Sequence, residues 1–205
     1  MSPAAQGEDP AVDVAFALEG RCLARDHARA LADALAAHLP WLADHPTAGV
    51  HPVKLVPGSE PVAWLSQRAR LLLRVPRSRE AALAVLGGCT LGVGGDVLRL
   101  GPPRSHPLLA HGTLYSSFVA AQSDDETAFM RHVDAELDAL GVDCHKICGK
   151  RQQRGSAPTQ LGFSLMLHEL SAADSLAVQR AGLGPHRGLG CGIFVPHRSA
   201  AAVGS

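Results

Sequence analysis

Apolar and polar residues alternate over residues 12–18, and the apolar positions there are Val12, Val14, Phe16 and Leu18. A period of two is the pattern of a half-buried strand. The spacing then changes to that of a helix, with an apolar stripe at Leu31, Leu35, His38/Leu39 and Leu42. Asp26 is placed to cap this helix, and Pro40 bends or ends it. The chain is therefore predicted to begin with a strand followed by a helix.

The rest of the first hundred residues contains the signals of two strands, a helix and a hairpin. The strands are expected at 50–56 and 70–75, the helix at 78–86 and the hairpin at 90–100. Pro57-Gly58 closes the first of these strands, and Gly87-Gly88 is a helix-stop signal. The hairpin is predicted from Gly94-Gly95-Asp96 between two apolar runs. The order is strand, helix, strand, strand, helix, strand.

The same order returns after a proline-rich stretch at 101–107. We expect a strand at 113–120, a helix at 124–140 and a second strand at 142–148, followed by a basic turn at 149–155. A third strand is expected at 161–167, and a helix capped by Ser171 at 171–181. A glycine-rich loop at 182–192 then leads to a last strand at 192–196. The chain is thus expected to repeat one supersecondary pattern.

Two consecutive βαββαβ units predict an α+β fold made of tandem ferredoxin-like (RRM-like) domains. Residues 1–10 are small and polar, and we expect them to be disordered. The N-terminal ferredoxin-like domain is expected at 11–101, a linker at 102–110, and the C-terminal domain at 111–198.

Composition changes this picture mainly by exclusion. Nineteen basic and nineteen acidic side chains cancel, so a polyanion site requires local segregation of charge. Five scattered cysteines, no apolar run of about 18 residues and no signal-peptide pattern favour a cytoplasmic protein without a membrane segment. Cys144 and Cys148 flank a histidine but lack a second ligand pair, so neither a metal nor another cofactor is expected. Only 4% of residues are aromatic, which disfavours ordinary RRM recognition of single-stranded RNA.

The glycine-rich loop contains five glycines in eleven residues, with Arg187 between them. Glycine allows backbone amides to approach a ligand closely, and amides beside a cation favour an anion such as phosphate. The alternative is a flexible connection between a helix and the last strand. Composition alone leaves both interpretations open.

Several motifs follow one another along residues 12–197: Asp26-His27, Gly49-Val50-His51-Pro52, 70–76, Thr113-Leu114-Tyr115, 137–141, Gly149-Lys150-Arg151 and the glycine-rich loop. Together they resemble the repeat-processing CRISPR endoribonucleases (the Cas six family) and are most similar to its Myxan subtype. The resemblance implies a metal-independent ribonuclease that cuts CRISPR precursor RNA within its repeats. It also implies, as in many such systems, retention on the 3′ hairpin of mature crRNA within a type I effector complex. Some relatives dimerise, and a homodimer is left open.

Metal-free RNA cleavage by the 2′-hydroxyl requires one group that accepts a proton and one that donates a proton, and histidine suits both tasks. His27, at the start of the first helix, is the first catalytic candidate, because the helix dipole disfavours its imidazolium form. Family members often place a catalytic histidine on or just after this helix. His51 is the second candidate. The alternative for both is a solvated turn histidine, and His38 is expected at the edge of the core.

RNA binding is expected from the basic turn and from the glycine-rich loop. The predicted contacts are Lys146, Lys150, Arg151, Arg154, Gly184, Arg187, Gly188 and Gly190. The alternative for the basic turn is a solvated hairpin tip, although few acidic residues adjoin it in the sequence. We expect the loop to hold RNA and the first domain to cut it. A non-catalytic crRNA-binding subunit with the same fold is the competing hypothesis.

Overall fold

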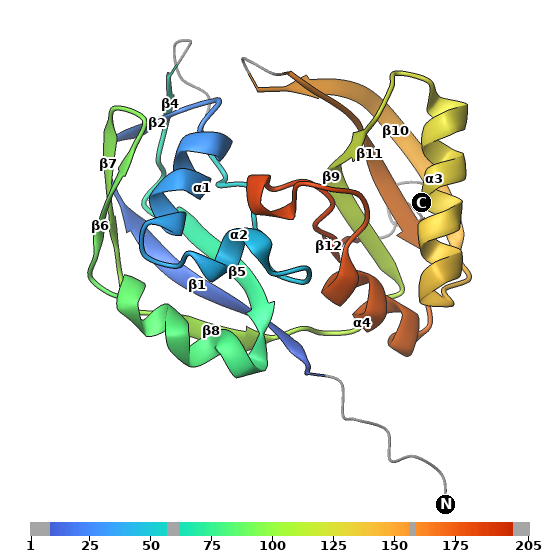
Figure 1. Cartoon of the computed structure of the whole chain (residues 1–205), viewed down its shortest axis with the longest axis horizontal. Coiled ribbons are helices and arrows are strands. Elements are labelled where there is room, and N and C mark those ends of the chain that lie inside the picture. Colours follow the sequence, from blue (N-terminus) through green and yellow to red (C-terminus); the bar gives the residue numbers. More distant parts are fainter. Residues whose placement is uncertain (1–8, 57–61, 156–158, 199–205) are drawn as a thin grey trace, which may run out of the picture.

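The computed structural model describes residues 9–56, 62–155 and 159–198. The chain forms two halves that lie side by side, each with an antiparallel sheet and helices (Figure 1). We call residues up to 107 the first half and the residues after them the second half. The first half contains β1 (Ala11–Glu19), β2 (Cys22–Ala24), α1 (Ala28–Ala36), α2 (Trp41–Asp44), β3 (Gly49–Val50), β4 (Val62–Trp64), β5 (Arg70–Pro76), the 3-10 helix η1 (Arg77–Leu86), β6 (Thr90–Val93), β7 (Asp96–Leu100) and β8 (Arg104–Pro107).

The second half repeats the strand–helix–strand–strand–helix–strand order. Its elements are β9 (Thr113–Ala121), α3 (Glu126–Leu140), β10 (His145–Arg154), β11 (Gln160–His168), α4 (Ala172–Ala181), the 3-10 turn η2 (Arg187–Leu189) and β12 (Val195–Pro196). The first sheet has the order β3-β5-β1-β7-β6, with β8 also paired to β1. The second sheet has the order β10-β11-β9-β12. In both sheets the first strand lies inside, which is the ferredoxin-like arrangement, and the predicted fold class is confirmed.

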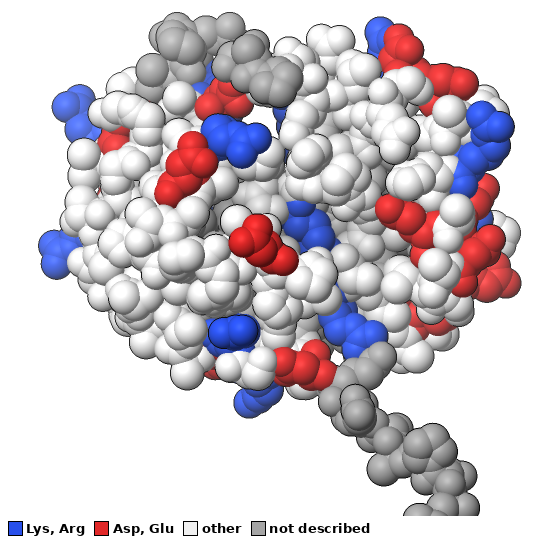
Figure 2. Space-filling model, viewed as in Figure 1, with Lys and Arg blue, Asp and Glu red and all other residues white. Residues whose placement is uncertain are grey.

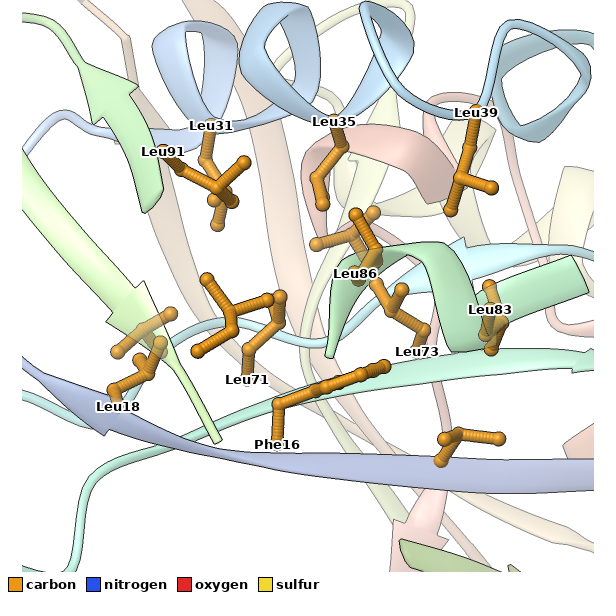
Figure 3. Packing of buried hydrophobic residues seen from close by; sticks show 14 of the residues in the cluster. Phe16, Leu18, Leu31, Leu35, Leu39, Leu71, Leu73, Leu83, Leu86 and Leu91 are labelled. Atoms are coloured by element: carbon orange, nitrogen blue, oxygen red, sulfur yellow. The ribbon is translucent and has the colours of Figure 1, made fainter. Parts of the chain in front are cut away.

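The core of the first half lies between the sheet and α1. Phe16 of β1 points toward the helix, where Leu31 and Leu35 follow one another at helical spacing (Figure 3). Leu83 and Leu86 of η1 pack into the same cluster. Each of these side chains is buried, and burying such a side chain contributes about 1.5–3 kcal/mol. The alternating pattern of β1 and the helical stripe therefore meet in one apolar layer.

The second half builds its own core from α3 and the inner strands of its sheet. Phe129 of α3 stacks on Phe163 of β11 with ring centroids 4.7 Å apart. Gly141 ends α3 in the left-handed conformation, as its position after the apolar stripe predicts. Ser171 caps α4 by accepting a hydrogen bond from the backbone N–H of Asp174, which confirms the predicted cap. The two helix ends thus follow from local sequence signals.

Four local predictions were wrong. Asp26 does not cap α1, because His27 occupies the N-cap position and no side chain caps the helix. His38 is exposed, because Leu39 rather than His38 continues the buried stripe. The strand predicted at 50–56 ends after Val50, since Pro52 has no N–H to donate to the neighbouring strand. The last strand is also shorter than predicted and covers only β12.

The basic segment 149–155 is not a turn, because β10 continues through it as far as Arg154. The register of β10 against β11 shifts between Cys148 and Arg151, so a bulge absorbs the extra residues. At Gly149 a Cβ atom would lie 2.3 Å from Ser164 Oγ, which explains the glycine there. The proline-rich stretch also differs from expectation, because its residues 104–107 form β8 on the edge of β1. Residues 1–8 and 57–58 lie outside the described residues.

Candidate active site between the two halves

A cleft of about 730 Å³ opens between the halves. The first half contributes the start of α1 and the segment after β3 to its walls. The second half contributes the end of β10, Gln160 and the segment 188–191. Figure 1 shows η2 beside α1, although the two elements are far apart in the sequence. The glycine-rich loop and both candidate histidines therefore border the same space, so the loop is not remote from the expected chemistry.

His27 is held at the N-terminus of α1 with one ring nitrogen committed to the backbone. Its Nδ1 donates a hydrogen bond to the Ala24 carbonyl at 2.8 Å, and a carbonyl can only accept. In the neutral ring the proton therefore sits on Nδ1, and Nε2 carries a lone pair. His27 as a whole is 9% exposed, and this burial lowers the pKa of His27 below its usual 6.5. His27 is thus built to be a neutral proton acceptor.

His51 follows β3 and is held by its backbone and its ring. Its N–H donates to the Leu72 carbonyl, and its Nε2 lies 3.2 Å from Asp13 Oδ1. The His51 side chain is 9% exposed, and this burial lowers the pKa of His51. The Asp13 carboxylate acts in the opposite direction, whereas the nearby Arg74 and Arg187 cations add to the lowering. Burial thus favours the neutral ring despite the adjacent carboxylate.

Arg154 lies on the wall of the cleft that belongs to the second half. Its Nη2 lies 3.4 Å from the Ser117 carbonyl and 3.3 Å from Ser117 Oγ, and its guanidinium covers the Phe118 ring at 4.5 Å. Burial lowers the pKa of this arginine, which nevertheless stays a cation at neutral pH. Arg25 and Arg29 lie on the opposite wall together with Asp26 and Asp33, so the formal charges of that wall balance. Arg154 is thus a cation that the second half adds to the cleft.

The sequence predicts that Arg187 contacts RNA, but in the structure its side chain is buried. Only 8% of the residue is exposed, and its guanidinium donates to the Thr47 and Ala48 carbonyls of the first half. Those donors face the interior, because the loop folds against the segment before β3. Desolvation lowers the pKa of Arg187 to about 10. Its side chain thus joins the two halves, and we assign no RNA contact to it.

The glycine positions in the loop differ in what they offer to a ligand. The Gly184 amide already donates to the Glu136 carboxylate at 2.7 Å, so an internal anion occupies that donor. Gly190 is buried, and its N–H donates to the Arg187 carbonyl. Gly188 is half-buried and borders the cleft, and a Cβ atom there would meet nothing within 4 Å. The loop is therefore a packed part of the fold with one open stretch facing the cleft.

Packing of the loop predicts a contrast between two of its glycines. We expect Gly192→Ala to lower the free energy of unfolding by at least about 2 kcal/mol, because φ is positive and a Cβ would lie 1.8 Å from the Leu183 carbonyl oxygen. Gly188→Ala should stay within about 0.5 kcal/mol of the wild type. Urea denaturation of both variants measures the difference. Equal stability of the two would contradict this account of the loop.

The remaining predicted RNA-binding cations lie on β10, at the edge of the second sheet. Lys146 pairs with Asp134 at 2.9 Å and Arg151 pairs with Asp124 at 2.7 Å, so acidic residues of α3 and its N-terminal turn adjoin this strand after all. Figure 2 shows acidic side chains gathered on the side of the molecule where α3 lies. Such exposed pairs are worth about 0–1 kcal/mol, so a phosphate can compete for these cations. Lys150 is exposed, and only Arg154 reaches the cleft.

Two polar residues of the site were not recognised as such from the sequence. Asp13 was only one of the positions that alternate with the apolar residues of β1, and Arg74 was noted only as part of a motif. In the structure Arg74 is fully buried and Asp13 binds both Arg74 and His51. The available signal was a charged residue inside the apolar run of β5, because a buried arginine requires partners.

No cluster of three or more histidine, cysteine, aspartate or glutamate side chains suited to a metal occurs among residues 9–56, 62–155 and 159–198. Burial raises the pKa of the Cys144 and Cys148 thiols, the latter to about 11. None of the helices in the described part of the chain is long and apolar enough to span a bilayer.

Comparison with known proteins adds a sequence relationship to this geometry. Residues 12–199 match the family model described as Cas6 Crispr. A protein of Myxococcus xanthus (strain DK1622) named CRISPR-associated endonuclease Cas6 is 36% identical over 196 residues. That match covers 95% of this chain and 85% of the relative.

Solved structures with much lower identity share the fold. A CRISPR-associated protein Cas6 superimposes with a TM-score of 0.68 at 10% identity, covering 92% of this chain and all of the other. A Cas6-related protein from Pyrococcus furiosus gives 0.62 at 11% identity, with 90% and 98% covered. A third, described as an RAMP protein that binds different RNA substrates, gives 0.61 at 12%, with 92% and 99% covered. Since the family model spans nearly the whole sequence and the Myxococcus relative matches over most of its length, this chain belongs to the Cas6 family of CRISPR-associated proteins.

Proposed function

We propose that this chain is a metal-independent endoribonuclease that cuts CRISPR precursor RNA within its repeats and stays on the 3′ hairpin of the product. Family membership and the named endonuclease activity of the Myxococcus relative support repeat RNA processing. The observation that carries the proposal is the cleft, in which two histidines with lowered pKa values face a wall that bears Arg154. These are the groups that cleavage by a neighbouring 2′-hydroxyl requires.

In this proposal His27 is the general base. Its Nε2 lone pair takes the proton of the 2′-hydroxyl, which attacks the adjacent phosphorus in line and displaces the 5′-oxygen of the next nucleotide. The products are a 2′,3′-cyclic phosphate and a 5′-hydroxyl. The leaving 5′-oxygen takes its proton from the imidazolium form of His51, which donates from Nδ1–H because Asp13 holds Nε2–H. His27 ends the step protonated and His51 ends it neutral.

Arg154 has a role distinct from those of the histidines. The phosphorane carries more negative charge than the phosphodiester, and a fixed cation at the cleft wall stabilises that extra charge. The Phe118 ring and Ser117 hold the guanidinium in place before RNA arrives, which reduces the cost of ordering it. The cations of β10 then bind phosphates outside the cleft, and the open stretch at Gly188 lets the RNA backbone approach.

A cleavage assay tests the function directly. Purified protein is incubated with end-labelled repeat RNA in excess EDTA, and we expect one cut with a product that ends in a cyclic phosphate. A 2′-deoxy substitution at the nucleotide before the cut should abolish cleavage and preserve binding. RNA that is shifted on a native gel but stays intact would instead support a non-catalytic crRNA-binding subunit. Cleavage that stops in EDTA would contradict the metal-independent mechanism.

A further inference from the structure

A buried charge network lies beneath the cleft. Arg74 of β5 has no exposed surface, and its Nε and Nη2 donate to the two carboxylate oxygens of Asp13 at 2.8 and 2.9 Å. Asp13 Oδ1 also lies 3.2 Å from His51 Nε2. This arrangement holds the pKa of Asp13 well below its usual range, so the carboxylate is an anion that can only accept hydrogen bonds. His51 Nε2 must therefore carry the proton.

The same guanidinium also reaches the second half. Arg74 Nη1 donates to the Gln179 carbonyl at 2.9 Å and to the Phe194 carbonyl at 2.8 Å. Gln179 belongs to α4, and Phe194 directly precedes β12. An isolated buried cation would be very costly, so these carbonyls and the carboxylate together make Arg74 stable in the interior. One side chain thus ties the docking of the second half to the carboxylate that binds His51.

A second arginine holds the segment that carries His51 from the other side. Arg187 of the glycine-rich loop donates to the carbonyls of Thr47 and Ala48, a few residues before His51. At Gly49 a Cβ atom would lie 3.0 Å from the Ile193 side chain, so the second half packs closely against β3. The backbone around His51 is therefore set by contacts with the second half.

We propose that Asp13 and Arg74 are positioning residues for His51. The carboxylate of Asp13 fixes the ring in the Nε2–H tautomer and leaves Nδ1 as the nitrogen that exchanges protons. Arg74 holds that carboxylate through Nε and Nη2 while its Nη1 binds the second half, so one guanidinium serves both the docking of the halves and the alignment of His51. This inference rests on the proposed function in giving His51 a part in cleavage.

An asparagine at position 13 separates charge from shape. Asp13 Oδ1 contacts both Arg74 Nε and His51 Nε2, so either orientation of the amide sets its NH₂ against one N–H of Arg74, and neither orientation supplies a negative charge. Without the carboxylate beside it, the imidazolium form of His51 that donates from Nδ1 is less stable, which lowers the pKa of the ring. A smaller imidazolium fraction slows proton donation to the leaving oxygen even when the geometry is kept.

The tautomer is read from the free protein by NMR. In ¹⁵N-histidine-labelled protein, with the His51 signals assigned by their loss in His51→Gln, we expect Nε2–H in the neutral wild-type ring. In a pH titration of the same signals, we expect a lower pKa of His51 in Asp13→Asn than in the wild type. Single-turnover cleavage by Asp13→Asn should fall about 10²-fold at unchanged RNA affinity. Asp13→Glu, which restores a carboxylate, should recover part of the wild-type pKa of His51. Asp44→Asn, which removes an exposed carboxylate of α2 outside the cleft, should change neither quantity.

A wild-type His51 that carries its proton on Nδ1 would overturn the inference, and this result needs no variant to fold. An unchanged pKa of His51 in folded Asp13→Asn would overturn it as well. Because the spectra are recorded without RNA, they are independent of the proposed function. A wild-type chain that binds repeat RNA but leaves it intact would refute the cleavage mechanism, while the spectra would still decide how His51 is positioned.

Discussion

Replacing His27 by glutamine is expected to lower the single-turnover rate of repeat cleavage by about 10²–10⁴-fold and to leave RNA binding close to that of the wild type. Glutamine approximates the size of the ring and its amide can still donate to the Ala24 carbonyl. It cannot accept a proton, however, so the loss isolates the function assigned to Nε2. The measurement is a cleavage time course with enzyme in excess, together with a filter-binding titration of uncleavable 2′-deoxy RNA.

The pH dependence of the same reaction gives a second check. A general base works when it is neutral, and burial lowers the pKa of His27 below its usual 6.5. The rate should therefore rise with pH along a limb whose midpoint lies below 6.5, and this limb should disappear in His27→Gln. His38→Gln, at an exposed position just after α1, serves as the control and should cut at the wild-type rate. A midpoint above 6.5, or an equal loss in the His38 variant, would contradict the assignment of His27.

Replacing Arg74 by methionine should lower the free energy of unfolding by about 3–5 kcal/mol, which is the cost of breaking a buried ion pair by removing one partner. Methionine fills much of the same volume but leaves the Asp13 carboxylate without its main partner. It also leaves the Gln179 and Phe194 carbonyls without the donor that Arg74 supplied. Chemical denaturation monitored by circular dichroism gives the free energy.

A matched arginine on the same sheet controls for the substitution itself. Arg99 of β7 is exposed, and Arg99→Met should stay within about 0.5 kcal/mol of the wild type. Adding Asp13→Asn to Arg74→Met should recover part of the lost stability, because the double variant no longer buries an uncompensated charge. A loss below about 1 kcal/mol in Arg74→Met would show that the network contributes little to docking of the halves.

Local patterns in the sequence were sufficient for most of the elements. The alternation around Phe16 and the stripe through Leu31 and Leu35 depend on neighbours within two turns of chain, and both appear in the structure where they were predicted. The caps at Gly141 and Ser171 are equally local. Errors arose where a partner strand decided the outcome, as in β10, whose bulge against β11 allowed the basic segment to continue as a strand.

The candidate site was predicted in part. His27 and His51 were chosen separately from the sequence, and the structure places both on one cleft, while their catalytic roles stay predictions. Arg187 was predicted to contact RNA, but its guanidinium is directed inward, because the loop folds against the segment before β3. The loop's own residues carry no sign of this. A glycine-rich stretch around an arginine is compatible with an anion cradle and with a packed interface.

The sequence by itself determined the two βαββαβ units, the cores that their apolar periods form and the membership in the Cas6 family. Only the tertiary structure decided which polar groups meet at the interface between the halves. The Arg74–Asp13, Arg74–Phe194 and Arg187–Thr47 hydrogen bonds join residues 61, 120 and 140 positions apart. Helical and strand periods report on near neighbours, whereas a buried ion finds its partners through packing of whole sheets and helices, which no local pattern encodes.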